Sequence, residues 1–233
     1  MRGLLVTGTD TGVGKTILSA ALLAAMSAAG RSVRAHKPVV TGLDGDEEAS
    51  GTPAWRPDHE LLGSAARMCP EEVSPLRYGA PAAPHLAARL AGDRIEPSEL
   101  LAAARAGDPE QTLVVEGVGG LLVPLADDYT VCDLAAALGL PLLIAARPGL
   151  GTINHALLTL RVARAAGLRV LAVVLTPWPA RPTTLERSNC ETIASLGEVE
   201  VHTLARACSD APGELARVGR VLPWRRWLEQ PST

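Results

Sequence analysis

The sequence predicts an α/β protein with a doubly wound, mostly parallel sheet. Three observations carry this prediction: short apolar runs, helical patterns between them, and a glycine-rich segment ending in Gly-Lys-Thr at 14–16. Strands that alternate with helices along a chain are typical of this class. The length of 233 residues is in the range of one large domain, so we expect a single domain over 1–233.

Five apolar runs are the predicted strands of this sheet. Each is short and almost continuously hydrophobic, which is typical of parallel strands that are buried on both faces. The runs are Leu4–Thr7, Val33–His36, Leu113–Val115, Leu142–Ala145 and Val170–Leu175.

Two helices are predicted between these runs. Apolar residues recur with a period near 3.6 over 17–26, and Gly30 stands where a residue after a helix end belongs. A second helix is expected from about Asn154 to Ala166, closed by Gly167.

Three stretches lack such patterns. Residues 42–57 are acidic, rich in glycine and bounded by proline, and predict a mobile surface loop. Residues 177–183 contain three prolines and predict a loop that leaves a strand. The last thirty residues are weakly patterned, and we expect Trp224 and Trp227 to pack in the interior.

Composition excludes several functional classes. Twenty-two Lys and Arg against 25 Asp and Glu give a net charge of −3, so no bulk attraction to nucleic acid or to an anionic membrane is expected. The longest apolar stretch, 138–146, is interrupted by Gly139 and Pro141 and is too short to span a bilayer. The polar residues Thr7 and Asp10 come too early for a signal peptide. We therefore expect a cytoplasmic protein.

The cysteines do not predict a metal site or a disulfide framework. They lie far apart, contain no Cys-x-x-Cys pair and are expected to be reduced, buried and small hydrophobic in character. The four are Cys69, Cys132, Cys190 and Cys208.

The most informative segment is GTDTGVGKT at 8–16, which follows a predicted strand and opens a predicted helix. Glycines let backbone N–H groups surround phosphate oxygens, and the helix N-terminus favours anions. Lys15 would neutralise the β- and γ-phosphates, and the Thr16 hydroxyl would complete a magnesium shell. Five residues separate Gly8 from Gly14, one more than in the common pattern, and the alternative is a glycine-rich turn with a chance Gly-Lys-Thr. The segment favours a fold of the P-loop nucleoside triphosphate hydrolase type.

Two further polar residues end predicted strands. Lys37 follows the second apolar run and Glu116 follows the third, so with Gly8 they should meet at one edge of the sheet. Magnesium prefers hard oxygen ligands such as a carboxylate. Taken singly, Lys37 is compatible with a solvated lysine and Glu116 with an ordinary loop acid, but three strand ends together predict a metal–nucleotide site.

Over residues 3–176 the chain resembles the dethiobiotin synthetase family. The resemblance is carried by GTDTGVGKT at 8–16, HKPVVTG at 36–42, APAAPH at 80–85, VEGVGGLLVPL at 115–125 and GTINHALLT at 151–159. It implies an enzyme that joins CO2 to 7,8-diaminopelargonic acid and closes a ureido ring, consuming Mg²⁺ and a nucleoside triphosphate. A carbamate would form, attack the γ-phosphate, and give a mixed anhydride that the second amine captures. The protein would supply positioning and charge neutralisation.

The resemblance also implies a role for each matching residue. Lys15 would act on the transferring phosphate, Lys37 between carbamate and γ-phosphate, and Thr11 on the carbamate or amines. The nucleotide-binding positions would be Gly12, Val13, Gly14, Lys15, Thr16, Glu116 and Thr176. The substrate-binding positions would be Thr11, Lys37, Thr41, Gly117, Val118, Gly119, Gly151 and Asn154. The magnesium ligands would be Thr16, Asp58 and Glu116.

The family further implies a homodimer whose interface completes the diamine site. The turn 117–120 would present backbone N–H groups beside the substrate. The turn Gly151–Asn154 would meet the substrate's carboxylate tail from the partner subunit, and a helix N-terminus at Asn154 suits an anion.

Several of these residues have simpler interpretations. Asp58 and Asn154 are compatible with helix N-caps, and Thr41 with an ordinary loop hydroxyl. His85 and His155 are expected to be structural, because this chemistry needs no imidazole.

Two positions depart from the family pattern. Gly12 stands where many relatives carry an acidic residue, so any role of that carboxylate is absent here. Thr176 stands where relatives that select adenine place an asparagine, and it offers a hydroxyl in place of an amide. We therefore expect a relaxed base preference, with ATP or CTP as co-substrate.

Two other readings share this kind of loop. A nucleotide-switched positioning or partitioning ATPase carries a second lysine in a KGGxGKT pattern, and here that position is Asp10. A cobyrinate-type amide-forming synthase usually adds a glutaminase domain, for which 233 residues are too few.

Overall fold

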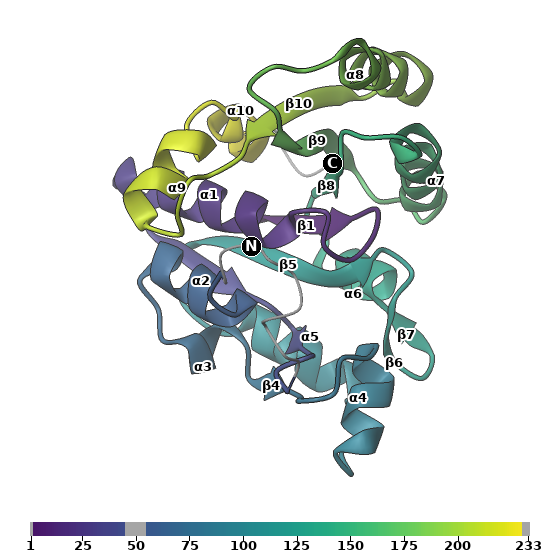
Figure 1. Ribbon diagram of the computed structural model, residues 1–233. Coiled ribbons are helices and arrows are strands. Elements are labelled where there is room, and N and C mark those ends of the chain that lie inside the picture. Colours follow the sequence, from purple (N-terminus) through teal and green to yellow (C-terminus); the bar gives the residue numbers. More distant parts are fainter. Residues whose placement is uncertain (1, 45–54, 230–233) are drawn as a thin grey trace.

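A parallel sheet runs through the centre of the molecule in the computed structural model, which describes residues 2–44 and 55–229 (Figure 1). Its strand order is β10-β9-β8-β1-β5-β2, and every neighbouring pair is parallel. The strands are β1 (Gly3–Gly8), β2 (Val33–His36), β5 (Thr112–Gly120), β8 (Leu142–Ala146), β9 (Val170–Trp178) and β10 (Glu200–Ala205). The chain passes from β1 over β5 to β2, and later from β5 over β1 to β8. The connections thus run outward in one direction from β1 to β2 and in the other direction from β5 to β8. Sheets of this class bind ligands at the point where the direction changes, which here lies beside β1 and β5.

Helices cover both faces of this sheet (Figure 1). They are α1 (Lys15–Ala28), α2 (Asp58–Ala66), α3 (Pro70–Val73), α4 (Pro84–Leu90), α5 (Pro97–Arg105), α6 (Val131–Leu138), α7 (Thr152–Ala165), α8 (Thr184–Gly197), α9 (Pro212–Gly219) and α10 (Trp224–Glu229). Short strand pairs flank the sheet: β3 (Val39–Val40) with β4 (Leu76–Arg77), and β6 (Pro124–Ala126) with β7 (Tyr129–Thr130). The predicted doubly wound α/β class is confirmed.

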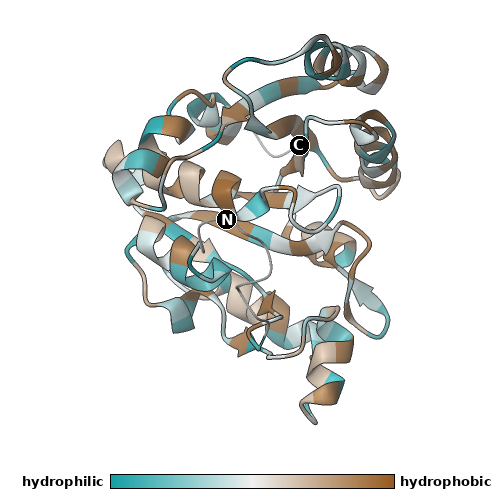
Figure 2. Ribbon diagram, in the orientation of Figure 1, coloured by the Kyte–Doolittle hydropathy of each residue, from teal (hydrophilic) through white to brown (hydrophobic). Residues whose placement is uncertain are grey.

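The core divides according to the alternation of side chains along the strands. Leu4 and Val6 of β1 pack with α1, α2 and α9 on one face, whereas Leu5 packs on the other face with α5 and α6. A smaller cluster joins β8 and β9 to α7 and α8. Strands β1 and β8 are buried at every residue, as is typical of parallel strands that are covered on both faces. Hydrophobic residues are found on strands and helices alike in Figure 2.

The five predicted strands are confirmed, two boundaries are corrected, and one further strand is present. The predicted helix at 154 begins two residues earlier, at Thr152, with Gly151 as its N-cap. The loop predicted at 177–183 begins after Trp178, because β9 continues through that residue. Strand β10 was not predicted, since at the sheet edge only Leu204 of its residues is buried.

The expectations for the remaining segments have mixed outcomes. Trp224 and Trp227 are buried, as predicted. All four cysteines are free, but Cys69 and Cys208 are exposed, so the prediction that all are buried is wrong. Residues 45–54 of the predicted acidic loop lie outside the described residues. In the described part of the chain, no helix is long and apolar enough to cross a membrane.

Candidate active site

The phosphate loop connects β1 to α1. Gly12 and Gly14 have positive φ angles of 68° and 94°, which favour glycine. Gly14 also needs space, since a Cβ there would lie 2.8 Å from Cγ2 of Thr176. The Nζ of Lys15 donates to the carbonyl of Asp10 at 2.8 Å, so this buried lysine spans the loop.

Four polar side chains meet beside the loop. The Thr16 hydroxyl lies 2.9 Å from Asp58 Oδ1 and 2.9 Å from Glu116 Oε1. The Nζ of Lys37 forms ion pairs with Asp58 at 2.5 Å and with Glu116 at 2.6 Å. Lys37 and Glu116 are almost completely buried, with 4% and 0% of their surface exposed. The predicted meeting of Lys37 and Glu116 is thereby confirmed.

Strand register explains why these residues meet. Val6 pairs with Glu116, and His36 pairs with Val115, so Glu116 lies level with the end of β2 and with the last residues of β1. Asp58 comes from the first turn of α2, whose N-cap is Pro57. The N-cap interpretation of Asp58 is therefore wrong, and its carboxylate is available to Thr16 and Lys37.

Burial and charge pairing set the protonation of this network. Burial disfavours the cation of Lys37, but the carboxylates of Asp58 and Glu116 outweigh burial and raise its pKa. Burial raises the pKa of Glu116, an effect that Lys37 opposes. Burial also acts upward on Asp58, but its contacts with Lys37 prevail and lower its pKa. Burial lowers the pKa of Lys15. At neutral pH, Lys37 is therefore a fixed cation.

The donor set fits a magnesium ion that also binds phosphate. Asp58, Glu116 and Thr16 provide hard oxygen atoms, and Oε2 of Glu116 is buried without a hydrogen-bond partner among the described residues. The described residues contain no cluster of three or more His, Cys, Asp or Glu side chains that would hold a metal alone. Phosphate oxygens would have to complete the shell, as is common for Mg²⁺.

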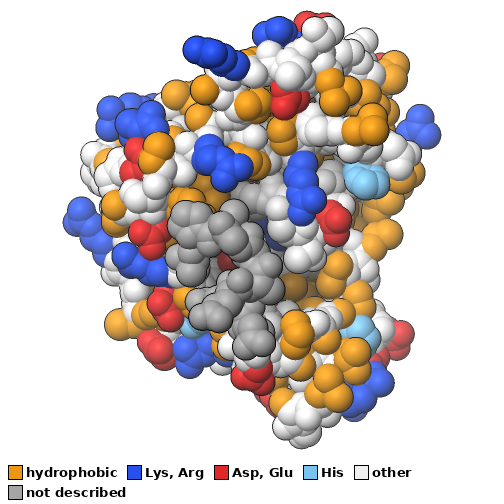
Figure 3. Space-filling view, in the orientation of Figure 1, with side chains coloured by type: hydrophobic (Ala, Val, Ile, Leu, Met, Phe, Trp, Pro, Cys, Tyr) orange, Lys and Arg blue, Asp and Glu red, His pale blue; other side chains and the backbone are white. Residues whose placement is uncertain are grey.

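A cleft of about 720 Å³ opens onto the network. Eleven of the predicted site residues line it: Thr11, Gly12, Gly14, Lys15, Thr16, Lys37, Thr41, Asp58, Glu116, Val118 and Gly119. On the face shown in Figure 3, acidic and basic side chains are interspersed with hydrophobic ones. The structure thus brings most of the predicted site together.

Five predicted residues lie outside this cleft. Val13 is buried in the core below the loop, and Thr176 is 1% exposed with its side chain against Gly14. Gly117 packs against Val131. The other two, Gly151 and Asn154, are exposed at the start of α7.

Two local predictions at these positions are wrong. Residues 117–120 do not form a turn that ends the strand, since β5 continues to Gly120. Gly120 pairs with Gly8 while Glu116 pairs with Val6, so the chain bulges between them. Asn154 is the third residue of α7 and does not cap it.

Sequence reasoning missed part of the cleft wall. Trp55 and Arg56 follow the acidic segment, and Arg56 forms an ion pair with Asp210 at 2.8 Å. Residues 81–84 also line the cleft. The two prolines of APAAPH at 80–85 are the sequence feature that could have indicated this part of the wall. Proline has a fixed φ angle and no backbone N–H, so it gives a rigid segment.

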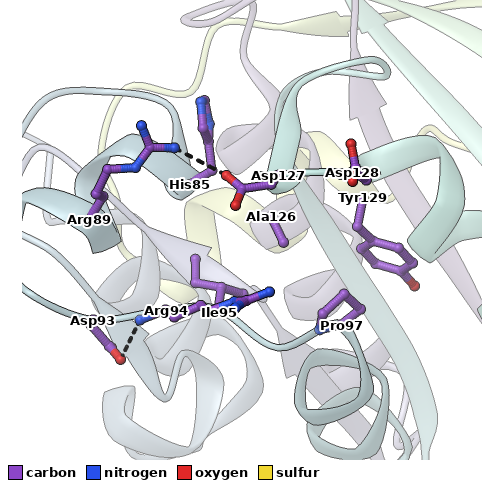
Figure 4. A pocket seen from close by; sticks show the side chains of 10 residues that line it. All are labelled: His85, Arg89, Asp93, Arg94, Ile95, Pro97, Ala126, Asp127, Asp128 and Tyr129. Atoms are coloured by element: carbon purple, nitrogen blue, oxygen red, sulfur yellow. Dashed lines mark hydrogen bonds and ion pairs between the residues drawn. The ribbon is translucent and has the colours of Figure 1, made fainter.

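A second, smaller pocket of about 350 Å³ lies between α4 and the β6–β7 pair (Figure 4). His85 lines this pocket and not the cleft. Arg89 and Asp127 form an ion pair at its rim, at 3.1 Å. The two charges compensate each other, so the pocket offers no unpaired charge from that pair.

Fold and site together define a nucleotide-binding protein of the phosphate-loop class, and residues 2–207 match a family model described as an AAA domain. The chain is 48% identical over 178 residues to an ATP-dependent dethiobiotin synthetase of Anaeromyxobacter dehalogenans, covering 75% of this chain and 76% of that protein. Over 202 residues it is 36% identical to the enzyme of that name from Bacillus subtilis strain 168, covering 86% and 85%. The chain belongs to the ATP-dependent dethiobiotin synthetase family.

Solved structures with the same fold are more distant. A cobyrinic acid a,c-diamide synthase from Mycobacterium smegmatis, with bound ATP analog and magnesium, gives a TM-score of 0.54 at 17% identity, covering 100% of this chain and 98% of that chain. A MinC:MinD cell division complex from Aquifex aeolicus gives 0.52 at 13% identity, covering 96% and 98%. At this identity the likeness shows the fold alone. The sequence relatives therefore separate the family from both alternative readings.

Proposed function

We propose that the cleft is where this chain catalyses the ATP-dependent ring closure of its family. The observation that carries this proposal is the buried network of Thr16, Lys37, Asp58 and Glu116 beside a phosphate loop. The substrates are a diamine, 7,8-diaminopelargonic acid, together with CO2 and a nucleoside triphosphate.

The reaction needs two anions to be brought together. One amine of the substrate adds to CO2 and loses a proton, giving a carbamate. A carbamate oxygen attacks the γ-phosphorus, the bond to the β-phosphate oxygen breaks, and a carbamic-phosphoric anhydride and nucleoside diphosphate result. The second amine attacks the carbamate carbon and loses a proton, phosphate leaves, and the ureido ring closes. No enzyme nucleophile takes part.

The chain's residues act by charge and position. Lys37 is a buried, permanent cation, and it bridges carbamate and γ-phosphate when both are bound. Lys15 neutralises the transferring phosphoryl group, and Thr11 hydrogen-bonds the carbamate. Thr41, Val118 and Gly119 line the cleft where the diamine would lie.

Magnesium would be held by Thr16, Asp58 and Glu116 together with phosphate oxygens. When bound, it supplies Lewis-acid polarisation of the γ-phosphate. The orphaned Oε2 of Glu116 supports this assignment.

The substrate's carboxylate tail is assigned to a second subunit. Gly151 and Asn154 are exposed at the N-terminal end of α7 and lie outside the cleft. A homodimer that places this helix end over the partner's cleft would supply N–H groups and a favourable dipole to the carboxylate.

The residue predicted to contact the base of the nucleotide does not select adenine. Thr176 is buried against Gly14 and carries no amide, so an adenine-specific pair of hydrogen bonds is absent at this position. We expect CTP to be used alongside ATP, which is the co-substrate in the names of the relatives.

Phosphate release tests this function. It is measured with Mg²⁺ and bicarbonate, with and without the diamine, in parallel for ATP, CTP and GTP. Release that depends on the diamine is the expected result. Release that ignores the diamine would overturn the ligase proposal, and a strict preference for ATP would overturn the expectation for the base.

A further inference from the structure

Arg147 contacts the phosphate loop from outside the cleft. Its Nη2 lies 3.3 Å from the carbonyl oxygen of Gly12 and 3.4 Å from that of Thr11, and its Nε lies 3.4 Å from the Gly12 oxygen. Thr11 and Gly12 line the cleft, whereas Arg147 does not. The guanidinium therefore contacts the carbonyls of the loop without lining the cleft.

The arginine is held in place by the fold. It follows β8 directly, and Ala145 of that strand pairs with Gly8 and accepts the N–H of Thr9 at 3.0 Å. Asn189 of α8 is 4% exposed, and its amide donates to the carbonyls of Pro148 and Gly149 at 2.9 and 3.1 Å. Strand and helix thus fix the backbone on both sides of Arg147.

A trans peptide directs its C=O and N–H in opposite directions. The Thr11 carbonyl shares a peptide with the N–H of Gly12, and the Gly12 carbonyl shares one with the N–H of Val13. A group that holds both carbonyls outward also directs both N–H groups toward the cleft. Polarising the carbonyls with a cation strengthens those donors.

We propose that Arg147 is a positioning residue that fixes the phosphate loop so that the N–H groups of Gly12 and Val13 face the nucleotide phosphates. This role rests on the nucleotide binding proposed above. The glycine at position 12 permits the contact, because a Cβ there would lie 3.1 Å from Nη2 of Arg147. The ligand concerned is the polyphosphate chain, and neither the base nor the diamine.

Binding of inorganic tripolyphosphate tests the role without involving the base. Calorimetry is carried out on the wild type, R147A, R147K and the control R161A, which removes an exposed arginine of α7. Adenosine binding and the KM values for nucleotide and diamine are measured on the same proteins. Thermal unfolding of each variant reports on the fold.

In R147A we expect tripolyphosphate affinity to fall and the nucleotide KM to rise about tenfold, the usual size for a hydrogen bond to a charged group. Adenosine affinity and the diamine KM stay unchanged, R147K recovers part of the loss, and R161A behaves as wild type. The role would be overturned if R147A bound tripolyphosphate as tightly as the wild type does. It would also be overturned if R147A lost as much affinity for adenosine as for tripolyphosphate. A wild type that binds neither tripolyphosphate nor ATP would overturn the proposed function and this role with it.

Discussion

The Nζ of Lys37 lies 2.6 Å from Oε1 of Glu116, and the two side chains are only 5% and 1% exposed. Lys37 directly follows β2, and Glu116 lies in the middle of β5, its neighbour in the sheet. A charge pair so deeply buried costs desolvation free energy that a hydrophobic pair would avoid. Both residues line the cleft, which indicates that the charge pair serves binding and catalysis more than stability.

Replacing Lys37 with methionine should abolish ring closure and destabilise the protein. Removal of one partner leaves Glu116 buried and unpaired, which typically costs about 3–5 kcal/mol. We expect diamine-dependent phosphate release to fall at least about a hundredfold, the range in which single electrostatic groups act. Urea unfolding should show the lower stability, and added Mg²⁺ should restore part of it. Normal turnover in K37M would contradict the role of the lysine.

Glu116→Gln and Asp58→Asn should each raise the Mg²⁺ concentration needed for half-maximal activity by at least about tenfold, since each removes an anionic oxygen ligand. Activity titrations with Mg²⁺ measure the effect. Glu60→Gln serves as the control, because Glu60 is exposed on the same helix as Asp58. An equal shift in the control, or none in the two variants, would argue against the metal assignment.

His36 should contribute to acid unfolding. Burial, followed by the nearby charge of Arg34, lowers the pKa of His36 from 6.5 to about 3. The unfolded state therefore binds a proton that the folded state does not, and stability falls as pH decreases from 6.5 toward 3. One such group contributes a slope of about 1.4 kcal/mol per pH unit. Urea unfolding of His36→Gln between pH 4 and 7 should lack this slope, whereas the exposed-site control His155→Gln should keep it.

Gly219→Ala should weaken the contact between α1 and α9. A Cβ at this position would lie 2.1 Å from the carbonyl oxygen of Ala21, a backbone atom that cannot move alone. Overpacking of this kind costs about 1–3 kcal/mol. Gly213→Ala is the matched control, since nothing lies within 4 Å of its Cβ on the same helix. Equal unfolding temperatures for the two variants would contradict the packing described.

The strands that could be predicted are those whose sequences are hydrophobic at consecutive positions. Strands such as β8, buried along their full length, stand out in the sequence, whereas β10 at the sheet edge does not. The ends of β5 and β9 were misplaced because glycine and proline usually end a strand. In this fold Gly117 lies in a bulge of β5, after which β5 pairs with β1 again at Gly120. Pro177 lies within β9.

The site was predictable where it depends on strand ends. Lys37 and Glu116 follow apolar runs, and parallel strands bring such residues to one edge. Arg147 also follows an apolar run, but its role depends on the path of the phosphate loop beside it. Trp55 reaches the cleft only through tertiary packing, for which its local sequence carries no signal.

The central claim is that the cleft joins a bicarbonate-derived carbon to the diamine at the expense of a nucleotide. The most direct measurement supplies ¹³C-bicarbonate, the diamine, Mg²⁺ and ATP, and follows the labelled carbon and the released phosphate together. We predict a labelled cyclic urea that forms in equal amount to phosphate and is lost in K37M. Phosphate release without incorporation of the label into the diamine would contradict the account.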